Sequence, residues 1–138
     1  MKRAFLIAFA IGVLTMTMAA IKVHHHRVVF DAATGEESWD GILNNVDNIR
    51  KEFGSERSDI EVVVHGKALG LVLKDGKVAY RVTKLAAEGV IFAACENTMR
   101  KQNVTRDALN PKATTVPSGV AEVVRKQEAG WSYVKAGG

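Results

Sequence analysis

The sequence predicts a three-layer α/β/α domain with a mostly parallel sheet of about five strands. Short runs of β-branched and other apolar residues, which are typical of buried parallel strands, alternate along the chain with segments of helical periodicity. This alternation specifies strand–helix–strand units, whose strands lie parallel within one sheet. The length of 138 residues and an apolar share of 47% fit one globular domain with a single core.

The first 20 residues differ from the rest. Lys2 and Arg3 precede an apolar run over residues 4–14, and the small residues Ala19 and Ala20 follow it. This order is typical of a secretory signal peptide, and the run is short for a membrane span, which needs roughly 20 residues. We therefore expect a signal peptide over residues 1–20, a periplasmic or otherwise secreted protein, and a single domain over residues 21–138. An uncleaved anchor is the alternative.

Cleavage would also change the charge. Without Lys2 and Arg3, 17 basic residues stand against 15 acidic ones, so the formal charge falls from +4 to +2. The sequence shows no Lys/Arg stripe with interleaved aromatic residues, which nucleic-acid binding favours. We expect no nucleic-acid partner and no membrane contact after cleavage.

The first half of the domain is expected to form a strand over residues 27–31, a helix and a second strand over residues 60–64. The helix is the clearest element, because its apolar residues repeat on one face. That face comprises Trp39, Ile42, Leu43, Val46, Ile49 and Phe53. Ser38 is suited to the N-cap and Gly54 to the end of the helix. The apolar stretch 68–73 is expected to form a helical turn or a loop over the sheet edge, which serves either as core cover or as an oligomer contact.

The second half is expected to contain a helix over residues 77–88, a strand ending at Cys95 and a short helix to Gln102. A turn over residues 105–109, a strand over 113–116, a helix ending at Gly130 and a strand over 131–135 complete the domain. The last helix should turn four side chains towards the sheet: Val120, Val123, Val124 and Gln127.

Cys95 is the only cysteine, so it cannot form an intrachain disulfide. In an exported protein such a thiol is buried, paired between chains, or chemically used. Amides at a helix N-terminus favour a thiolate by about 0.3–1 kcal/mol, and by up to about 2 kcal/mol when partly buried. This activation is weak and Glu96 opposes it, so a further cation is needed. His65 is the best candidate within the chain, because Arg100 lies off the helical face of the thiol.

The carboxyl ends of parallel strands meet at one edge of the sheet, where ligand sites gather. The predicted strands deliver four segments to that edge: Asp31, His65, Cys95, and Pro117 with Ser118. Asn97 and Thr98 follow Cys95 and are suited to donate hydrogen bonds to a bound oxyanion or persulfide. A thiol that only fills space at the strand end is the alternative.

Three adjacent histidines, His24 to His26, open the mature chain. An extended chain sends alternate side chains to opposite faces, and no second ligand cluster has convincing spacing. We expect a solvated arm and no metal site. Metal capture by several copies within an oligomer is a weaker alternative.

Three segments of the chain resemble the DsrE/DsrF-like family, and in particular its small exported members. They are residues 62–66 (VVVHG), 92–100 (FAACENTMR) and 116–122 (VPSGVAE), and the resemblance covers about residues 27–135. It implies a compact α/β/α domain that assembles into homo-oligomers, commonly trimers or hexamers. In sulfur-relay members, the cysteine that matches Cys95 carries sulfur as a persulfide and passes it to a partner thiol.

The resulting hypothesis is an exported sulfur-handling protein, similar to a sulfurtransferase, that acts without a cofactor and exchanges sulfur with a donor or acceptor protein. Cys95 would accept or transfer sulfane sulfur in a pocket shaped by His65, Gly66, Asn97, Thr98, Pro117 and Ser118. Two features depart from the relay members, which work in the cytoplasm: the signal segment, and the lack of a second cysteine. The alternative is a non-catalytic oligomeric binding or scaffold protein with a structural cysteine.

Overall fold

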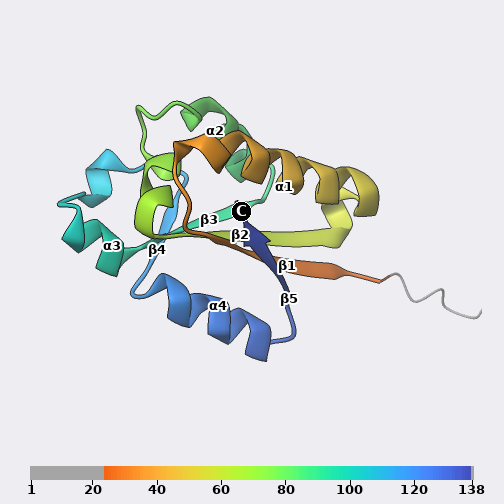
Figure 1. Cartoon of the computed structure of the whole chain (residues 1–138). Coiled ribbons are helices and arrows are strands. Elements are labelled where there is room, and N and C mark those ends of the chain that lie inside the picture. The colour runs from red at the N-terminus through yellow and green to blue at the C-terminus, as the bar shows by residue number, and fades with distance from the viewer. Residues whose placement is uncertain (1–23, 138) are drawn as a thin grey trace, which may run out of the picture.

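A computed structural model describes residues 24–137 of the chain (Figure 1). Five strands form one parallel sheet in the order β4-β3-β2-β1-β5. The strands are β1 (His26–Ala32), β2 (Ser58–Val64), β3 (Ile91–Cys95), β4 (Thr114–Val116) and β5 (Ser132–Ala136). The predicted α/β/α class is confirmed, and the sheet is parallel throughout. The predicted signal segment lies outside the described residues.

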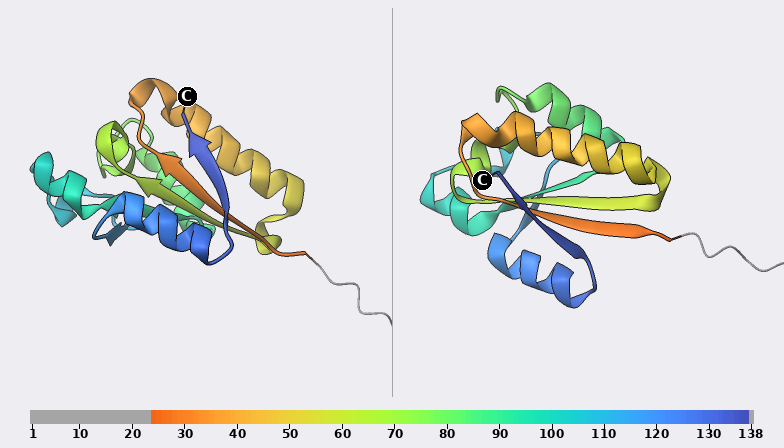
Figure 2. Two further views of the ribbon diagram at one scale, coloured as in Figure 1. Left: turned by 60° about the horizontal axis from the view of Figure 1, so that its bottom comes forward. Right: turned by 45° about the vertical axis from the view of Figure 1, so that its right-hand side comes forward.

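Helices cover both faces of the sheet. The right-hand view of Figure 2 shows two of them on one side and a third on the other. The first two are α1 (Trp39–Phe53) and α2 (Ala79–Ala87), the third is α4 (Gly119–Glu128), and the short α3 (Glu96–Lys101) follows β3 directly. Single 3-10 turns lie at Glu36–Ser38, Ser55–Arg57 and Arg106–Ala108. Within residues 24–137, no helix is long and apolar enough to cross a membrane.

The main core lies between the sheet and the α1/α2 layer. It receives alternate residues of the strands, such as Val28 and Phe30 of β1 and Val62 of β2, because successive strand side chains point to opposite faces. The stripe of α1 packs against them, and Trp39, Ile42, Leu43 and Val46 are buried as predicted. Gly54 ends α1 with a φ of 89°, in the left-handed region that favours glycine. Ser38 occupies the N-cap position, but its hydroxyl donates to the carbonyl of Gly35 instead of capping the helix.

The apolar stretch after β2 forms the 3-10 helix η3 (Gly66–Val72), which packs into the main core. Ala68, Leu69, Leu71 and Val72 are all buried within the single chain. Of the two roles predicted for this stretch, it therefore serves as core cover. It also starts beside the site described below, because Gly66 follows the end of β2 by two residues.

On the second face, α4 packs alone against β1 and β2. Val123 contacts Val29 and Val63, with Trp131 beside them. The prediction that Val120, Val124 and Gln127 face the sheet was wrong. All three are exposed, Val120 to 63% and Val124 to 47%. A single helix on a sheet buries only a narrow stripe, and within residues 24–137 no other helix packs against the flanks of α4.

An ion pair completes this second interface. The ammonium of Lys126 lies 2.6 Å from a carboxylate oxygen of the buried Glu61 on β2, and 4.2 Å above the ring of Trp131. Burial raises the pKa of Glu61, whereas the hydrogen bond and charge of Lys126 lower it, and burial prevails. Lys126 therefore stabilises a carboxylate that the apolar surroundings disfavour.

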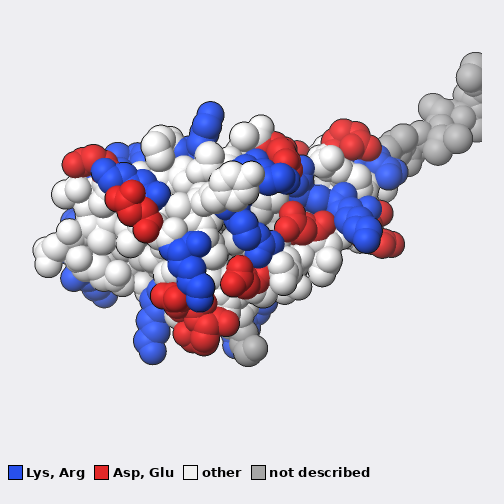
Figure 3. Space-filling model, turned by 90° about the horizontal axis from the view of Figure 1, so that it is seen from above, with Lys and Arg blue, Asp and Glu red and all other residues white. Residues whose placement is uncertain are grey.

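Acidic and basic side chains are interleaved on the outer surface of the α1/α2 layer (Figure 3). Arg81 of α2 donates hydrogen bonds to Asp40, Asn44 and Asp47 of α1. Exposed pairs of this kind contribute about 0.2–1 kcal/mol each. They hold the two helices in register without supplying much of the stability.

We predict that Lys126→Met destabilises the domain by about 3 kcal/mol at neutral pH, because it leaves the Glu61 carboxylate buried without a partner. A carboxyl group whose pKa is raised in the folded state stabilises the fold when protonated, and this contribution is lost as the pH rises through the folded pKa. The stability that Lys126→Met loses should therefore become smaller as the pH falls towards 4.5, the ordinary pKa of a glutamate carboxyl group.

Urea unfolding at several pH values measures this effect. Arg125→Met is the matched control, because Arg125 is an exposed neighbour whose ion pair within residues 24–137 is with Glu122, not with the buried Glu61. It should change the free energy of unfolding by less than about 0.5 kcal/mol. Equal losses in the two variants at neutral pH would contradict the role assigned to Lys126.

Candidate functional site

Cys95 lies where three elements meet at the carboxyl edge of the sheet. It is the last residue of β3 and the N-cap residue of α3, and it is 5% exposed. Gly119, the first residue of α4, approaches it closely. A Cβ atom placed on Gly119 would lie 3.2 Å from the Cβ atoms of both Cys95 and His65. The N-terminus of α4 therefore rests on the ends of β2 and β3 because residue 119 has no side chain.

Four hydrogen-bond donors near Cys95 lower the pKa of its thiol. They are the backbone N–H groups of Asn97, Thr98 and Gly119 and the hydroxyl of Thr98. Burial raises the pKa of the thiol, but the four donors outweigh it and lower the pKa below the ordinary value of 9.0. Three of these donors are amides at the starts of α3 and α4, where backbone N–H groups have no partner within the helix. We call this arrangement the thiolate cradle.

Thr98 is itself held in position for this role. The N–H of Gly66 donates to the Thr98 hydroxyl oxygen at 3.1 Å, so the hydroxyl hydrogen is available for the sulfur. Gly66 has a φ of 55°, which glycine adopts at little cost, and its carbonyl accepts from the Gln102 side chain at 2.9 Å. The start of η3 and the helix α3 thus orient the one side-chain donor of the cradle.

His65 lies beside the cradle but does not belong to it. Val64 pairs with Ala94, so His65 is the position across from Cys95. Its Nε2 atom lies 2.6 Å from an Asp31 carboxylate oxygen, and the other oxygen of Asp31 accepts a hydrogen bond from the Tyr133 hydroxyl at 3.1 Å. We expected His65 to supply a cation that activates the thiol. The groups that lower the pKa of Cys95 are instead neutral hydrogen-bond donors.

The other predicted site residues occupy different positions around the thiol. The side-chain oxygen of Asn97 accepts a hydrogen bond from Arg100. The part of Asn97 that lowers the pKa of the thiol is its backbone N–H. Ser118 is the N-cap of α4, and its hydroxyl accepts from the N–H of Ala121. Pro117 is exposed before it. The Glu96 carboxylate, expected to oppose the thiolate, accepts from the Thr115 hydroxyl on β4.

Sequence reasoning missed two residues of this site. Gly119 was noticed only as part of a motif, although a serine before a helix start marks where free amides lie. That these amides face Cys95 depends on the strand order, which spacing does not reveal. Tyr133 was assigned only to the last strand, and its partnership with Asp31 follows from the pairing of β5 with β1.

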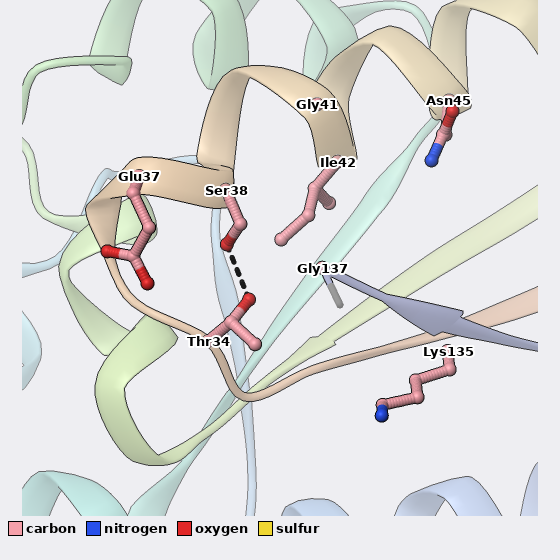
Figure 4. A pocket seen from close by; sticks show the side chains of 8 residues that line it. All are labelled: Thr34, Glu37, Ser38, Gly41, Ile42, Asn45, Lys135 and Gly137. Carbon is pink, nitrogen blue, oxygen red and sulfur yellow. Dashed lines mark hydrogen bonds between the residues drawn. The ribbon is translucent and has the colours of Figure 1, made fainter.

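A cavity of about 540 Å³ opens elsewhere on the carboxyl edge, between the start of α1 and the end of β5 (Figure 4). Figure 4 shows the hydroxyls of Thr34 and Ser38 facing each other at its wall. Its lining residues are Thr34, Glu37, Ser38, Gly41, Ile42, Asn45, Lys135 and Gly137. It lies beyond β1 and β5, whereas Cys95 ends β3, two strands from β1. It holds no thiol or imidazole, so we assign the candidate chemistry to the cradle.

The rings of His24 and His26 lie 4.7 Å apart, edge to face, whereas His25 turns to a different neighbour. His25 lies 3.0 Å from Asp59, and the ring of His26 stacks on Phe53. Across the described part of the chain, no group of three or more His, Cys, Asp or Glu side chains is placed to hold a metal ion.

Comparisons with known proteins agree on the fold. The sequence model of the DsrE/DsrF-like family matches residues 10–136. The structure of a protein of unknown function, MTH1491 from Methanobacterium thermoautotrophicum, is similar with a TM-score of 0.75 and 32% identity, over 80% of this chain and 98% of that one. The crystal structure of the ychN protein from E. coli is similar with a TM-score of 0.65 and 15% identity, over 81% and 98%. No curated protein sequence matches the chain.

We predict that Thr98→Val slows alkylation of Cys95 by iodoacetamide about tenfold at neutral pH. A hydrogen bond to a charged group contributes about 1.5 kcal/mol, which corresponds to about tenfold in thiolate population. Thr105→Val is the matched control, because Thr105 is exposed and follows α3. An alkylation rate that is equal in the wild type and Thr98→Val would show that the Thr98 hydroxyl does not stabilise the thiolate.

Proposed function

The chain belongs to the DsrE/DsrF-like family, and on this premise we propose that it carries sulfane sulfur on Cys95 as a persulfide. The observation that supports this function is the thiolate cradle. A buried cysteine that only fills space needs no hydrogen-bond donors, and burial alone would raise its pKa. Here the donors lower the pKa of a nearly buried thiol.

The proposed reaction is an exchange between two sulfur–sulfur bonds. The Cys95 thiolate attacks the outer sulfur of a donor persulfide, a new bond forms between the two sulfur atoms, and the bond within the donor breaks with release of the donor thiol. The reverse exchange passes the outer sulfur to an acceptor thiol. Because Cys95 is the only cysteine, that acceptor belongs to another molecule. The cradle keeps Cys95 in the nucleophilic thiolate form.

We further propose that the protein forms homo-oligomers through α4. Val120 and Val124 lie one turn apart, and both are largely exposed on a helix beside which the described residues place no other helix. Apolar side chains grouped in this way favour a protein contact. An interface here would lie next to the thiolate cradle, because α4 begins at Gly119.

Export through the signal segment over residues 1–20 is also part of the proposal. It is motivated by the charged start, the short apolar run and the small residues that follow. N-terminal sequencing of the mature protein would place its first residue after Ala19 or Ala20, and a mature chain that retains Met1 would contradict cleavage.

Persulfide loading tests the function directly. Purified protein incubated with an alkyl persulfide should gain the mass of one sulfur atom, and a thiol should remove it again. Cys95→Ser should gain none. Native wild-type protein that gains no sulfur, and whose thiol reacts with iodoacetamide no faster than a buried control thiol, would support the scaffold alternative instead.

Sedimentation tests the oligomer. Wild-type protein should sediment as an assembly, and the double variant Val120→Lys/Val124→Lys should sediment as a smaller species because charges would be buried at the interface. Asn48→Lys adds a charge on the exposed face of α1, on the opposite side of the sheet, and should leave the mass unchanged. A monomeric wild type would contradict the proposal.

A further inference from the structure

Beside the thiolate cradle, His65, Asp31 and Tyr133 form a connected polar group that the cradle does not use. Asp31 accepts hydrogen bonds on both carboxylate oxygens, from His65 and from Tyr133. Tyr133 stays protonated in this role, because partial burial and the neighbouring Asp31 raise its pKa. The carboxylate is thereby fixed from two sides, and the imidazole is fixed by the carboxylate.

This arrangement determines which nitrogen of His65 is engaged. Nε2 lies 2.6 Å from the acceptor oxygen of Asp31, so Nε2 carries a hydrogen whenever Asp31 is ionised. The second nitrogen, Nδ1, is then the atom that can gain or lose a proton. A carboxylate that fixes one imidazole nitrogen in this way favours proton transfer at the other.

The side chains of His65 and Cys95 also leave neighbouring strands on the same face, because one Cβ placed on Gly119 would lie 3.2 Å from the Cβ atoms of both. His65 follows β2 across from Cys95 on β3, and adjacent strands are about 4.8 Å apart. In-line attack on a persulfide places the leaving sulfur about two S–S bond lengths, or roughly 4–5 Å, from the attacking sulfur. The side chains of His65 and Asp31 are 19% and 27% exposed, so they border the edge from which a donor reaches the buried thiol.

We propose that His65 is the proton donor to the leaving thiolate during sulfur transfer to Cys95, and that Asp31 is its positioning residue. This inference rests on the proposed function. The Cys95 thiolate attacks the outer sulfur of R–S–SH, forming one S–S bond as the other breaks. The released RS⁻ takes the proton of the His65 imidazolium, so the products are the Cys95 persulfide, RSH and neutral His65. The Cys95 sulfur is oxidised as the donor sulfur is reduced, and no external oxidant is needed.

Two sulfur donors distinguish this role from a structural one. Glutathione persulfide releases an alkyl thiolate, which leaves faster when it is protonated. An arenethiosulfonate anion, ArSO2–S⁻, gives its outer sulfur to Cys95 and releases a sulfinate, which needs no proton. His65→Gln should slow transfer from glutathione persulfide about 100-fold and transfer from the thiosulfonate less than about threefold. Its alkylation by iodoacetamide should match that of the wild type, because the cradle does not include His65.

Two further variants complete the test. Asp31→Asn should slow sulfur transfer from glutathione persulfide about tenfold, because it disturbs the orientation of His65. Transfer from the thiosulfonate should be unchanged. His25→Gln is the matched control, because His25 pairs with Asp59 away from the thiol, and it should leave both rates unchanged. Added imidazole should restore part of the lost rate in His65→Ala.

Equal slowing with both donors, or no slowing with either, would overturn the assignment of His65 while leaving the carrier function in place. Wild-type protein that accepts sulfur from neither donor would contradict the carrier function, and the assignment of His65 with it.

Discussion

The close approach of α4 to Cys95 is the constraint on which the site depends. A Cβ on residue 119 would lie 3.2–3.3 Å from Cys95, His65 and Val63, so a side chain there would crowd all three residues. The absence of that side chain lets the first amide of α4 reach the sulfur. At its other end, α4 is held by the pairing of Lys126 with the buried Glu61. The helix is thus tied to the sheet at both ends, and its N-terminus is directed at the thiol.

Two opposed effects decide the state of that thiol. Removing a thiolate from water costs free energy, and burial is the largest single influence on the pKa of Cys95. Hydrogen bonds to a charged group contribute about 1.5–3 kcal/mol each, and three backbone amides and one hydroxyl act together here. Their combined effect exceeds the cost of burial. The same two helix starts would also favour the negative charge of a bound persulfide anion.

The helices and strands could be predicted from the sequence, but the complete set of site residues could not. The alternation of apolar strands with the periodic stripe of α1 predicted the fold class, and the junction at Cys95 placed a thiol at a helix start. Gly119 and Tyr133 reach the site only through the strand order, because β4 and β5 lie at opposite edges of the sheet. His65 faces Asp31 through the pairing of β1 with β2. The exposure of Val120 and Val124 was missed because valines suggest burial, and whether a second helix packs beside α4 is a tertiary property.

The central claim is that the fold stabilises the Cys95 thiolate despite its burial. Ultraviolet absorbance of the thiolate, followed as the pH is raised, measures this directly in native protein and in protein unfolded by urea. We expect a midpoint near the ordinary value of 9.0 in urea and a clearly lower midpoint in the native state. A native midpoint equal to or above that of the unfolded chain would contradict the account, because burial would then outweigh the four donors.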